Sequence, residues 1–147
     1  MIDVSEKEVT TRVAQASGTI KLNQDAFKSI VDLNNKKGDV INTARLAGIN
    51  AAKQTSNLIP LAHNISITYV DIDFEFDKTN NEITTIVQVK SEGKTGVEIE
   101  ALVAVQISLM TIYDMCKYLD RGMVINNIRL LSKTGGKSGA YIRGNND

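Results

Sequence analysis

The apolar residues of this chain concentrate in one stretch, residues 97–117, where no glycine or proline interrupts a helix. Residues 101–110 are apolar on nearly every side, which is typical of a helix buried on more than one face. Charged residues return only at its two ends, where they are Glu98, Glu100, Asp114 and Lys117. The pattern therefore predicts a buried central helix, and we expect function at its charged ends.

Shorter periodic segments flank this helix. Apolar and polar residues alternate where we predict four strands, over residues 18–22, 65–74, 83–91 and 123–131. Apolar or small residues recur at helical spacing where we predict two further helices, over residues 24–33 and 40–58. The order β-α-α-β-β-α-β predicts an α+β protein, a two-layer ferredoxin-like sandwich with a mostly antiparallel four-stranded sheet and helices on one face.

The chain has 147 residues without an internal repeat or a dividing linker, so we expect one domain over residues 1–147. Residues 1–16 are polar and mixed, which predicts an extended N-terminal arm or a short helix. Residues 133–147 begin with a basic, glycine-rich run and lack core-forming side chains. We therefore expect a mobile tail there.

Composition narrows the function classes. Lysine plus arginine equals aspartate plus glutamate at 17 each, so net charge gives no general attraction to nucleic acid or to a membrane. Residues 1–6 lack the build of a signal peptide, and the longest apolar run is far shorter than the roughly 18 residues of a membrane span. Cys116 is the only cysteine, which fits a reducing compartment. We expect a cytoplasmic protein without nucleic-acid or membrane partners.

Two segments, residues 93–95 and 136–138, look like part of a phosphate-binding P-loop. That motif requires a glycine five positions before its second glycine, where this chain has Gln88 and Leu131. The sequence therefore excludes a nucleotide-hydrolysing P-loop. A glycine-rich segment still precedes the central helix, whose N-terminus attracts anions.

Ordinary structural roles compete with chemical ones at the ionisable residues. Thr95 and Glu98 have the spacing of a capping box, in which Glu98 satisfies a backbone amide. Asp114 and Lys117 form either an exposed ion pair, which the residues alone favour, or a catalytic carboxylate with a neighbouring cation. His63, the only histidine, is either a satisfied structural group or a proton carrier, and it has no partners for a metal site.

Seven strings in this chain are long or unusual: MIDVS (1–5), KGDV (37–40), TAR (43–45), IPLAH (59–63), GKTGVEIEAL (93–102), TIYDMCK (111–117) and KTGGKSG (133–139). Together they resemble the molybdenum cofactor biosynthesis protein C family. The resemblance implies a pyrophosphate-releasing lyase of molybdenum cofactor biosynthesis. It implies conversion of 3′,8-cyclo-7,8-dihydroguanosine 5′-triphosphate, made from GTP, to cyclic pyranopterin monophosphate by general acid/base rearrangement.

The resemblance also implies site residues, position by position. Those matching catalytic positions are Asp114, the assigned active-site acid, together with Lys117, Lys37 and His63. Those matching substrate-binding positions are Leu61, Ala62, His63, Glu98, Ile99, Glu100, Lys133, Lys7 and Arg12. Many relatives have cysteine in place of Ala62 and methionine in place of Ile99, and neither departure removes a polar catalytic group.

The implied reaction involves no redox change, so we expect no cofactor. Mg²⁺ could arrive with the substrate phosphates, but the sequence offers no protein cage for it. Glu100 and Asp114 are fourteen residues apart on one helix, about 21 Å. If both belong to one site, two chains must build it. We therefore expect a homo-oligomer with sites at subunit interfaces, and the resemblance implies a homohexamer arranged as a trimer of dimers.

A non-catalytic, oligomeric nucleotide-sensing module of ferredoxin-like fold is the rival interpretation. Composition and fold do not separate it from an enzyme. A sensor has no need of Lys37, His63 and Asp114 with Lys117 beside them, so the ionisable residues favour the enzyme.

Overall fold

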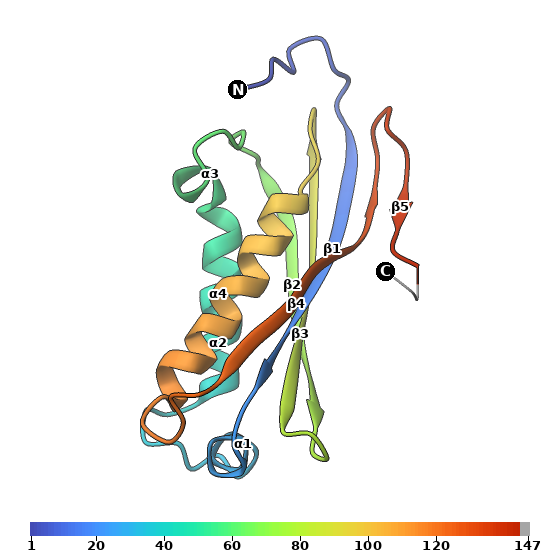
Figure 1. Ribbon diagram of the computed structural model, residues 1–147. Helices are drawn as coiled ribbons and strands as arrows, with labels where there is room; N and C mark the ends of the chain where they lie inside the picture. Colours follow the sequence, from blue (N-terminus) through green and yellow to red (C-terminus); the bar gives the residue numbers. More distant parts are fainter. Residues whose placement is uncertain (145–147) are drawn as a thin grey trace.

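The computed structural model describes residues 1–144, and residues 145–147 of the expected tail lie outside the described part (Figure 1). The elements in chain order are β1 (Thr10–Lys21), α1 (Gln24–Val31), α2 (Val40–Lys53), α3 (Thr55–Leu58), β2 (Ile67–Asp77), β3 (Glu82–Gly93), α4 (Glu98–Cys116), β4 (Val124–Thr134) and β5 (Tyr141–Ile142).

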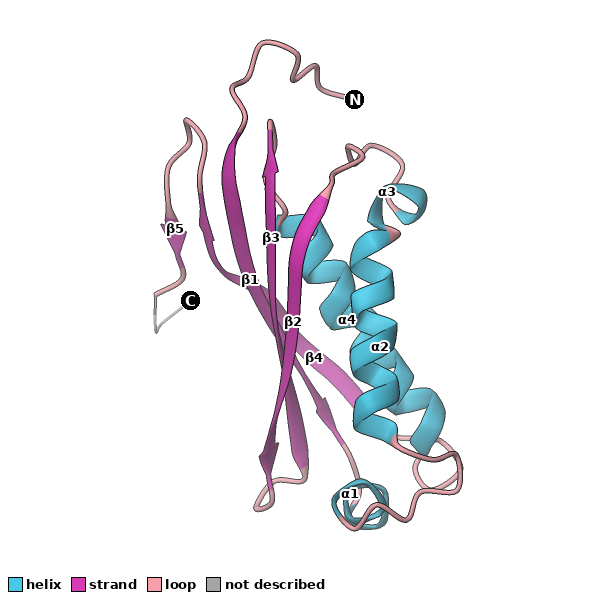
Figure 2. Cartoon of the chain, turned by 180° about the vertical axis from the view of Figure 1, so that it is seen from behind, coloured by secondary structure: helices cyan, strands magenta, loops and turns pink. Residues whose placement is uncertain are grey.

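The sheet has the strand order β2-β3-β1-β4-β5, and every neighbouring pair is antiparallel. Helices α2 and α4 cover one face and leave the other face open (Figures 1 and 2). The four long strands and the two layers confirm the predicted ferredoxin-like α+β sandwich. The two-residue strand β5 adds a fifth strand, within the segment expected to be a tail.

Helix α4 lies at the centre of the hydrophobic core, and Val105, Leu109 and Ile112 on it are fully buried. Small residues let α2 pack closely against it. A Cβ added to Gly48 would overlap the Ser108 hydroxyl and the Ile72 side chain. The helix is long and apolar enough to cross a membrane by length and composition, which corrects the expectation from its shorter apolar run, but more than half of it is buried inside the fold. Burial of this kind is typical of a core helix.

Strand β1 begins at Thr10, so the prediction of an arm reaching residue 16 is wrong for its second half. The strand lies between β3 and β4 and pairs with both. This pairing on two sides holds the chain in an extended conformation from Thr10 onward. Its inward side chains there are Ala14 and Ala16, 1% and 0% exposed. Such small residues give little alternation signal in the sequence.

Two more boundaries differ from the prediction. The helix expected over residues 40–58 divides into α2 and α3 at Gln54. Residues 133 and 134 of the expected tail complete β4 instead of leaving the sheet. The mobility of the remaining tail stays a prediction.

Candidate active site

A cavity of about 510 Å³ lies at the N-terminal end of α4, where the N-terminal segment and the connection from α3 to β2 meet the first turn of the helix. The expected site residues that line it are Lys7, Leu61, Ala62, His63, Glu98, Ile99 and Glu100. Residues far apart in sequence thus share one cavity, as the family resemblance implies. We call this group the cavity cluster.

Glu100 is the buried acid of the cavity cluster, with 3% of its surface exposed. Burial raises the pKa of Glu100, and the nearby carboxylate of Glu98 adds to the rise. A carboxyl group in this setting holds its proton more readily than an exposed one. It can therefore exchange a proton, or share a hydrogen bond, with a ligand in the cavity.

Glu98 does not act in a capping box, so that prediction is wrong. Helix α4 begins at Glu98, and its N-cap, Val97, makes no side-chain hydrogen bond. Because Glu98 is the first helical residue instead of the third, its carboxylate is free to pair with Lys133 Nζ on β4 at 3.0 Å. A Cβ on Gly96 would overlap this carboxylate, so the glycine provides the room it occupies.

His63 is held by the N-terminal segment. Its Nε2 lies 2.7 Å from the carbonyl oxygen of Ile2. Since a carbonyl only accepts, Nε2 carries a proton in this contact, and in the neutral ring Nδ1 is left as an acceptor. Lys94 Nζ donates to the carbonyl oxygen of Ser5 at 2.6 Å. The segment is thus tied across the cavity at two points, and sequence reasoning missed the contribution of Lys94.

A second cavity, of about 470 Å³, shares Lys7 with the first and is also lined by Arg12 and Lys137. Arg12 is 7% exposed, and its Nε donates to the carbonyl oxygen of Gly93 at 3.1 Å. Three cationic side chains around one cavity suit a polyphosphate.

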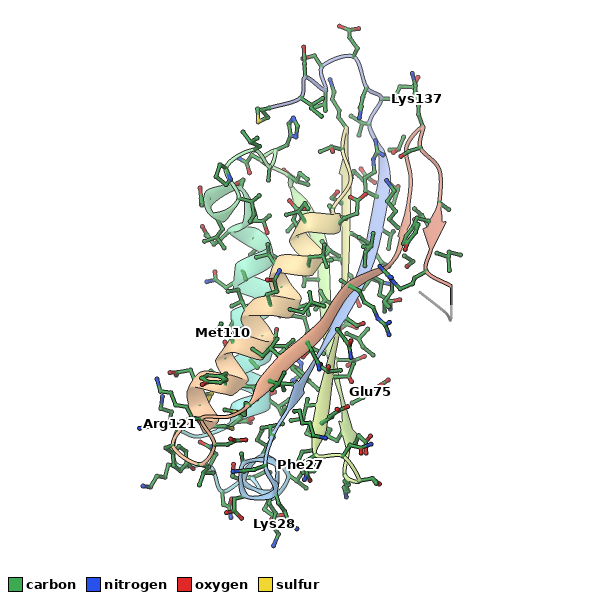
Figure 3. The ribbon with its side chains drawn as sticks, in the orientation of Figure 1. Phe27, Lys28, Glu75, Met110, Arg121 and Lys137 are labelled. Atoms are coloured by element: carbon green, nitrogen blue, oxygen red, sulfur yellow. The ribbon has the colours of Figure 1, made fainter. Side chains whose placement is uncertain are left out.

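The glycine-rich tail closes over this second cavity. Gly135 and Gly136 have φ angles of +100° and +79°, which favour glycine. A Cβ on Gly136 would overlap the guanidinium of Arg12. Lys133 Nζ donates to the hydroxyl of Ser138 at 3.2 Å. The two glycines therefore let the tail lie against Arg12 and bring Lys137 near the N-terminal segment, at the opposite end of the molecule from Arg121 (Figure 3).

The remaining expected residues meet at the C-terminal end of α4, and we call them the triad cluster. Asp114 Oδ2 pairs with Lys37 Nζ at 2.9 Å, and Asp114 Oδ1 pairs with Lys117 Nζ at 2.8 Å. The hydrogen bonds from Lys117 and then Lys37 lower the pKa of Asp114 to about 2. The exposed ion pair that the sequence favoured is present, with a second lysine added from the loop between α1 and α2.

The structure brings residues together within each cluster but not between them. Glu100 and Asp114 lie on the same helix, about 21 Å apart along its axis. Figure 1 shows α4 running from the end near the N-terminus to the opposite end of the molecule. Within residues 1–144 no group of three or more histidine, cysteine, aspartate or glutamate side chains is placed to hold a metal ion. The candidate residues of the described chain therefore form two separate clusters, and neither provides a metal cage.

Comparison with known proteins identifies the family. The model of the MoaC family matches residues 1–136. The chain belongs to the MoaC family. A relative in Staphylococcus carnosus named cyclic pyranopterin monophosphate synthase is 55% identical over 144 residues, which cover 97% of this chain and 89% of the relative.

Two other relatives carry the same name. The protein of Heliobacterium modesticaldum is 52% identical over 143 residues, covering 97% of this chain and 90% of the relative. The protein of Limosilactobacillus fermentum is 55% identical over 141 residues, covering 96% and 85%. The family resemblance stated from the sequence is confirmed, and the family match over residues 1–136 includes the residues of both clusters.

Proposed function

We propose that this chain converts 3′,8-cyclo-7,8-dihydroguanosine 5′-triphosphate to cyclic pyranopterin monophosphate and releases pyrophosphate. The observation that carries the proposal is identity of 52–55% over nearly the whole chain to MoaC-family proteins named cyclic pyranopterin monophosphate synthase. The two ionisable clusters supply the acid, base and cationic groups that such a reaction needs.

The cavity cluster and the basic cavity beside it bind the substrate in this proposal. Lys7 and Arg12, which line the basic cavity, and Lys133, which pairs with Glu98 in the free chain, contact the triphosphate and stabilise the charge that develops on the leaving pyrophosphate. His63 and Glu100 lie in the adjoining cavity, where they contact the ring system. The ribose-derived hydroxyl forms a bond to the innermost phosphorus, and the bond from that phosphorus to the pyrophosphate oxygen breaks.

The triad cluster transfers the protons of ring opening and pterin closure. Asp114 is ionised at working pH because its pKa is about 2, so in the free chain it orients the two lysines, and it becomes a better proton acceptor when substrate draws those ammonium groups away. Lys37 and Lys117 bring proton donors to within 2.9 Å of it. Bound substrate would compete with the carboxylate for these ammonium groups.

We further propose that two chains share each site. Helix α4 exposes an apolar stripe at helical spacing, in which Ile99, Ile107 and Met110 are 42%, 36% and 55% exposed. A second copy packed antiparallel along this stripe would place its Asp114 beside the Glu100 end of the first copy. A two-fold axis makes both sites complete at once. By analogy with the family, we propose a homohexamer, a trimer of such dimers.

The proposal includes a cytoplasmic location and no resident cofactor. The one cysteine, Cys116, is a buried free thiol, and burial raises its pKa to about 11, so it is an unreactive core residue. Mg²⁺ enters, if at all, with the substrate phosphates. Neither a nucleic acid nor a membrane is among the proposed partners.

The activity test supplies the cyclised GTP intermediate to the purified full chain and measures pyrophosphate and cyclic pyranopterin monophosphate. We expect both products in equal amounts, and none from an Asp114→Ala variant. The rival interpretation, a nucleotide sensor, predicts binding of the intermediate without pyrophosphate. Saturable binding with no turnover would therefore replace the enzyme by the sensor.

The shared-site test mixes inactive Glu100→Ala and Asp114→Ala chains under exchange conditions. Random pairing places intact halves together in roughly a quarter of the sites, so we expect roughly a quarter of the wild-type activity. The matched control mixes Asp114→Ala with Lys37→Ala, whose defects lie in the same cluster, and recovers nothing. Equal recovery in both mixtures, or none in either, would contradict the shared site.

A further inference from the structure

The loop between α1 and α2 carries Lys37, and its one buried polar side chain within the described residues is Asn35, 8% exposed. The Asn35 amide nitrogen donates to the carbonyl oxygen of Met115 and to the hydroxyl of Ser29, both at 3.2 Å. It also lies 3.6 Å from the sulfur of Cys116. Asn35 thus joins α1 to the last turn of α4.

The other end of the same amide faces the loop backbone. Asn35 Oδ1 accepts a hydrogen bond from the backbone N–H of Lys37 at 2.9 Å, which closes an Asx turn. The preceding backbone N–H, that of Lys36, donates to the Tyr118 hydroxyl at 2.9 Å. One loop amide is therefore fixed to Tyr118, just after the end of α4, and the next is fixed to Asn35, whose side chain is itself bonded to α4.

This anchoring matters because Lys37 has a long, flexible side chain. Its Nζ donates both to the carbonyl oxygen of Asp114, at 3.1 Å, and to Asp114 Oδ2, at 2.9 Å. Both partners sit on α4, whereas Lys37 arrives from a loop 77 residues earlier in the chain. Holding its backbone at a fixed point reduces the conformations that the side chain must give up to make these bonds.

We propose that Asn35 is a positioning residue, supported by Tyr118, that holds Lys37 in register with Asp114. Its catalytic consequence rests on the proposed function, but the placement of Lys37 does not. The two ends of the Asn35 side chain have different roles. The amide nitrogen binds groups on α1 and α4, and Oδ1 fixes the backbone of Lys37. A purely structural Asn35 would need only the first.

The test follows the Asp114 carboxyl directly, by NMR titration of the purified full chain without substrate. The pKa of Asp114, about 2, depends in part on the hydrogen bond from Lys37. We expect Asn35→Ala to raise the pKa of Asp114, as Lys37→Ala should, and we expect Tyr118→Phe to raise it by a smaller amount. With substrate, we expect Asn35→Ala to lower kcat by about 10–100-fold, as for a displacement of about 1 Å at a reacting group, with a smaller change in KM.

Ser29→Ala is the matched control. It removes one partner of the Asn35 amide nitrogen from the same buried cluster but leaves Oδ1 and the Lys37 N–H in place. We expect a lower unfolding temperature and an unchanged Asp114 titration. A shift in Ser29→Ala as large as in Asn35→Ala would mean general damage to the core and would overturn the proposal.

An Asp114 titration that is unchanged in folded Asn35→Ala would also overturn it. If Asn35→Ala does not fold, Tyr118→Phe decides, because Tyr118 is 40% exposed and its ring remains beneath Lys36. No shift in that variant contradicts the anchored loop. Because the titration requires no substrate, its outcome is independent of whether the proposed reaction is found.

Discussion

The two ends of α4 place carboxylates in opposite physical settings. At the N-terminal end, Glu100 is 3% exposed in a cavity, and burial raises its pKa. At the C-terminal end, the Asp114 side chain is 55% exposed between two lysines, and their hydrogen bonds lower its pKa to about 2. One helix therefore has a carboxyl that favours its proton at one end and a carboxylate that releases it at the other.

The difference bears on the proposal that two copies share each site. The cavity cluster lines a space of about 510 Å³ but contains a single lysine, Lys7. The triad cluster instead gathers two lysines on one exposed carboxylate. In the proposed function a water-excluded site needs both properties, which is the physical reason to propose a site built by two copies.

The largest expected effect concerns Asp114, at the C-terminal end of α4. Asp114→Asn keeps the shape but removes the charge that holds both lysines. We expect turnover to fall by about 10²–10⁴-fold, as for loss of a general base, with only a small fall in the unfolding temperature because the ion pairs of Asp114 are exposed. Single-turnover pyrophosphate release and thermal unfolding check this. The exposed Asp25→Asn on α1 serves as control, and near-normal turnover of Asp114→Asn would exclude a chemical role.

A substitution that disturbs the packing of α2 against the middle of α4 should lower the stability of the fold without affecting either cluster. Gly48→Ala forces a methyl group against Ser108 and Ile72, so we expect a loss of about 1–3 kcal/mol in the free energy of unfolding. Neither carboxyl titration should move. Denaturant unfolding measures the loss, with Gly122→Ala, which meets only an ordinary contact, as control. A neutral Gly48→Ala would mean that α2 and α4 can separate without penalty.

Glu100, at the N-terminal end of α4, should make the stability of the fold depend on pH in the direction opposite to that of Asp114, at the C-terminal end. Because the folded pKa of Glu100 lies above its ordinary value of 4.5, the protonated form stabilises the fold below that value, and this contribution is lost as the pH rises. Glu100→Gln should therefore raise the unfolding temperature at pH 7 relative to wild type, and less so at pH 4. Thermal scans at both values test this, and a lower unfolding temperature at pH 7 would refute it.

The pKa shift of Asp114 has the opposite sign to that of Glu100. Its folded pKa of about 2 lies below its ordinary value of 3.8, so its stabilising contribution is present above 3.8 and is lost as the pH falls toward 2. In the Asp114→Asn variant, the decrease in stability that protonation of Asp114 causes should be absent from the acid unfolding curve. An acid limb identical to that of wild type would show that the exposed pair adds nothing to stability.

The smallest effect concerns the ion pair between Glu98 and Lys133. Both side chains are about a quarter exposed, and we expect Lys133→Met to change the free energy of unfolding by less than about 1 kcal/mol. Denaturant unfolding at low and high salt measures it beside Lys53→Met, an exposed lysine on α2. A loss of several kcal/mol would make the pair structural instead of a ligand contact.

Local pattern predicted the elements well where side chains are large and periodic. The hairpin of β2 and β3 follows from strict alternation, and α4 from an unbroken apolar run. The local pattern failed for the first half of β1, because its inward residues include small alanines. It also failed for Glu98, which has the spacing of a capping box with Thr95 but pairs instead with Lys133 on β4. Both failures arise where a distant segment decides a local conformation.

The central helix, its charged ends and the distance between them follow from the residue pattern, because helical periodicity and rise are local properties. The partners of the charged residues come from long-range packing: Lys133 for Glu98, Lys37 for Asp114, and the tail glycines for Arg12. These contacts join residues 35 to 124 positions apart, and no local pattern records such pairings. The fold completes each cluster by bringing a loop or a strand to one end of a helix that the residue pattern predicts.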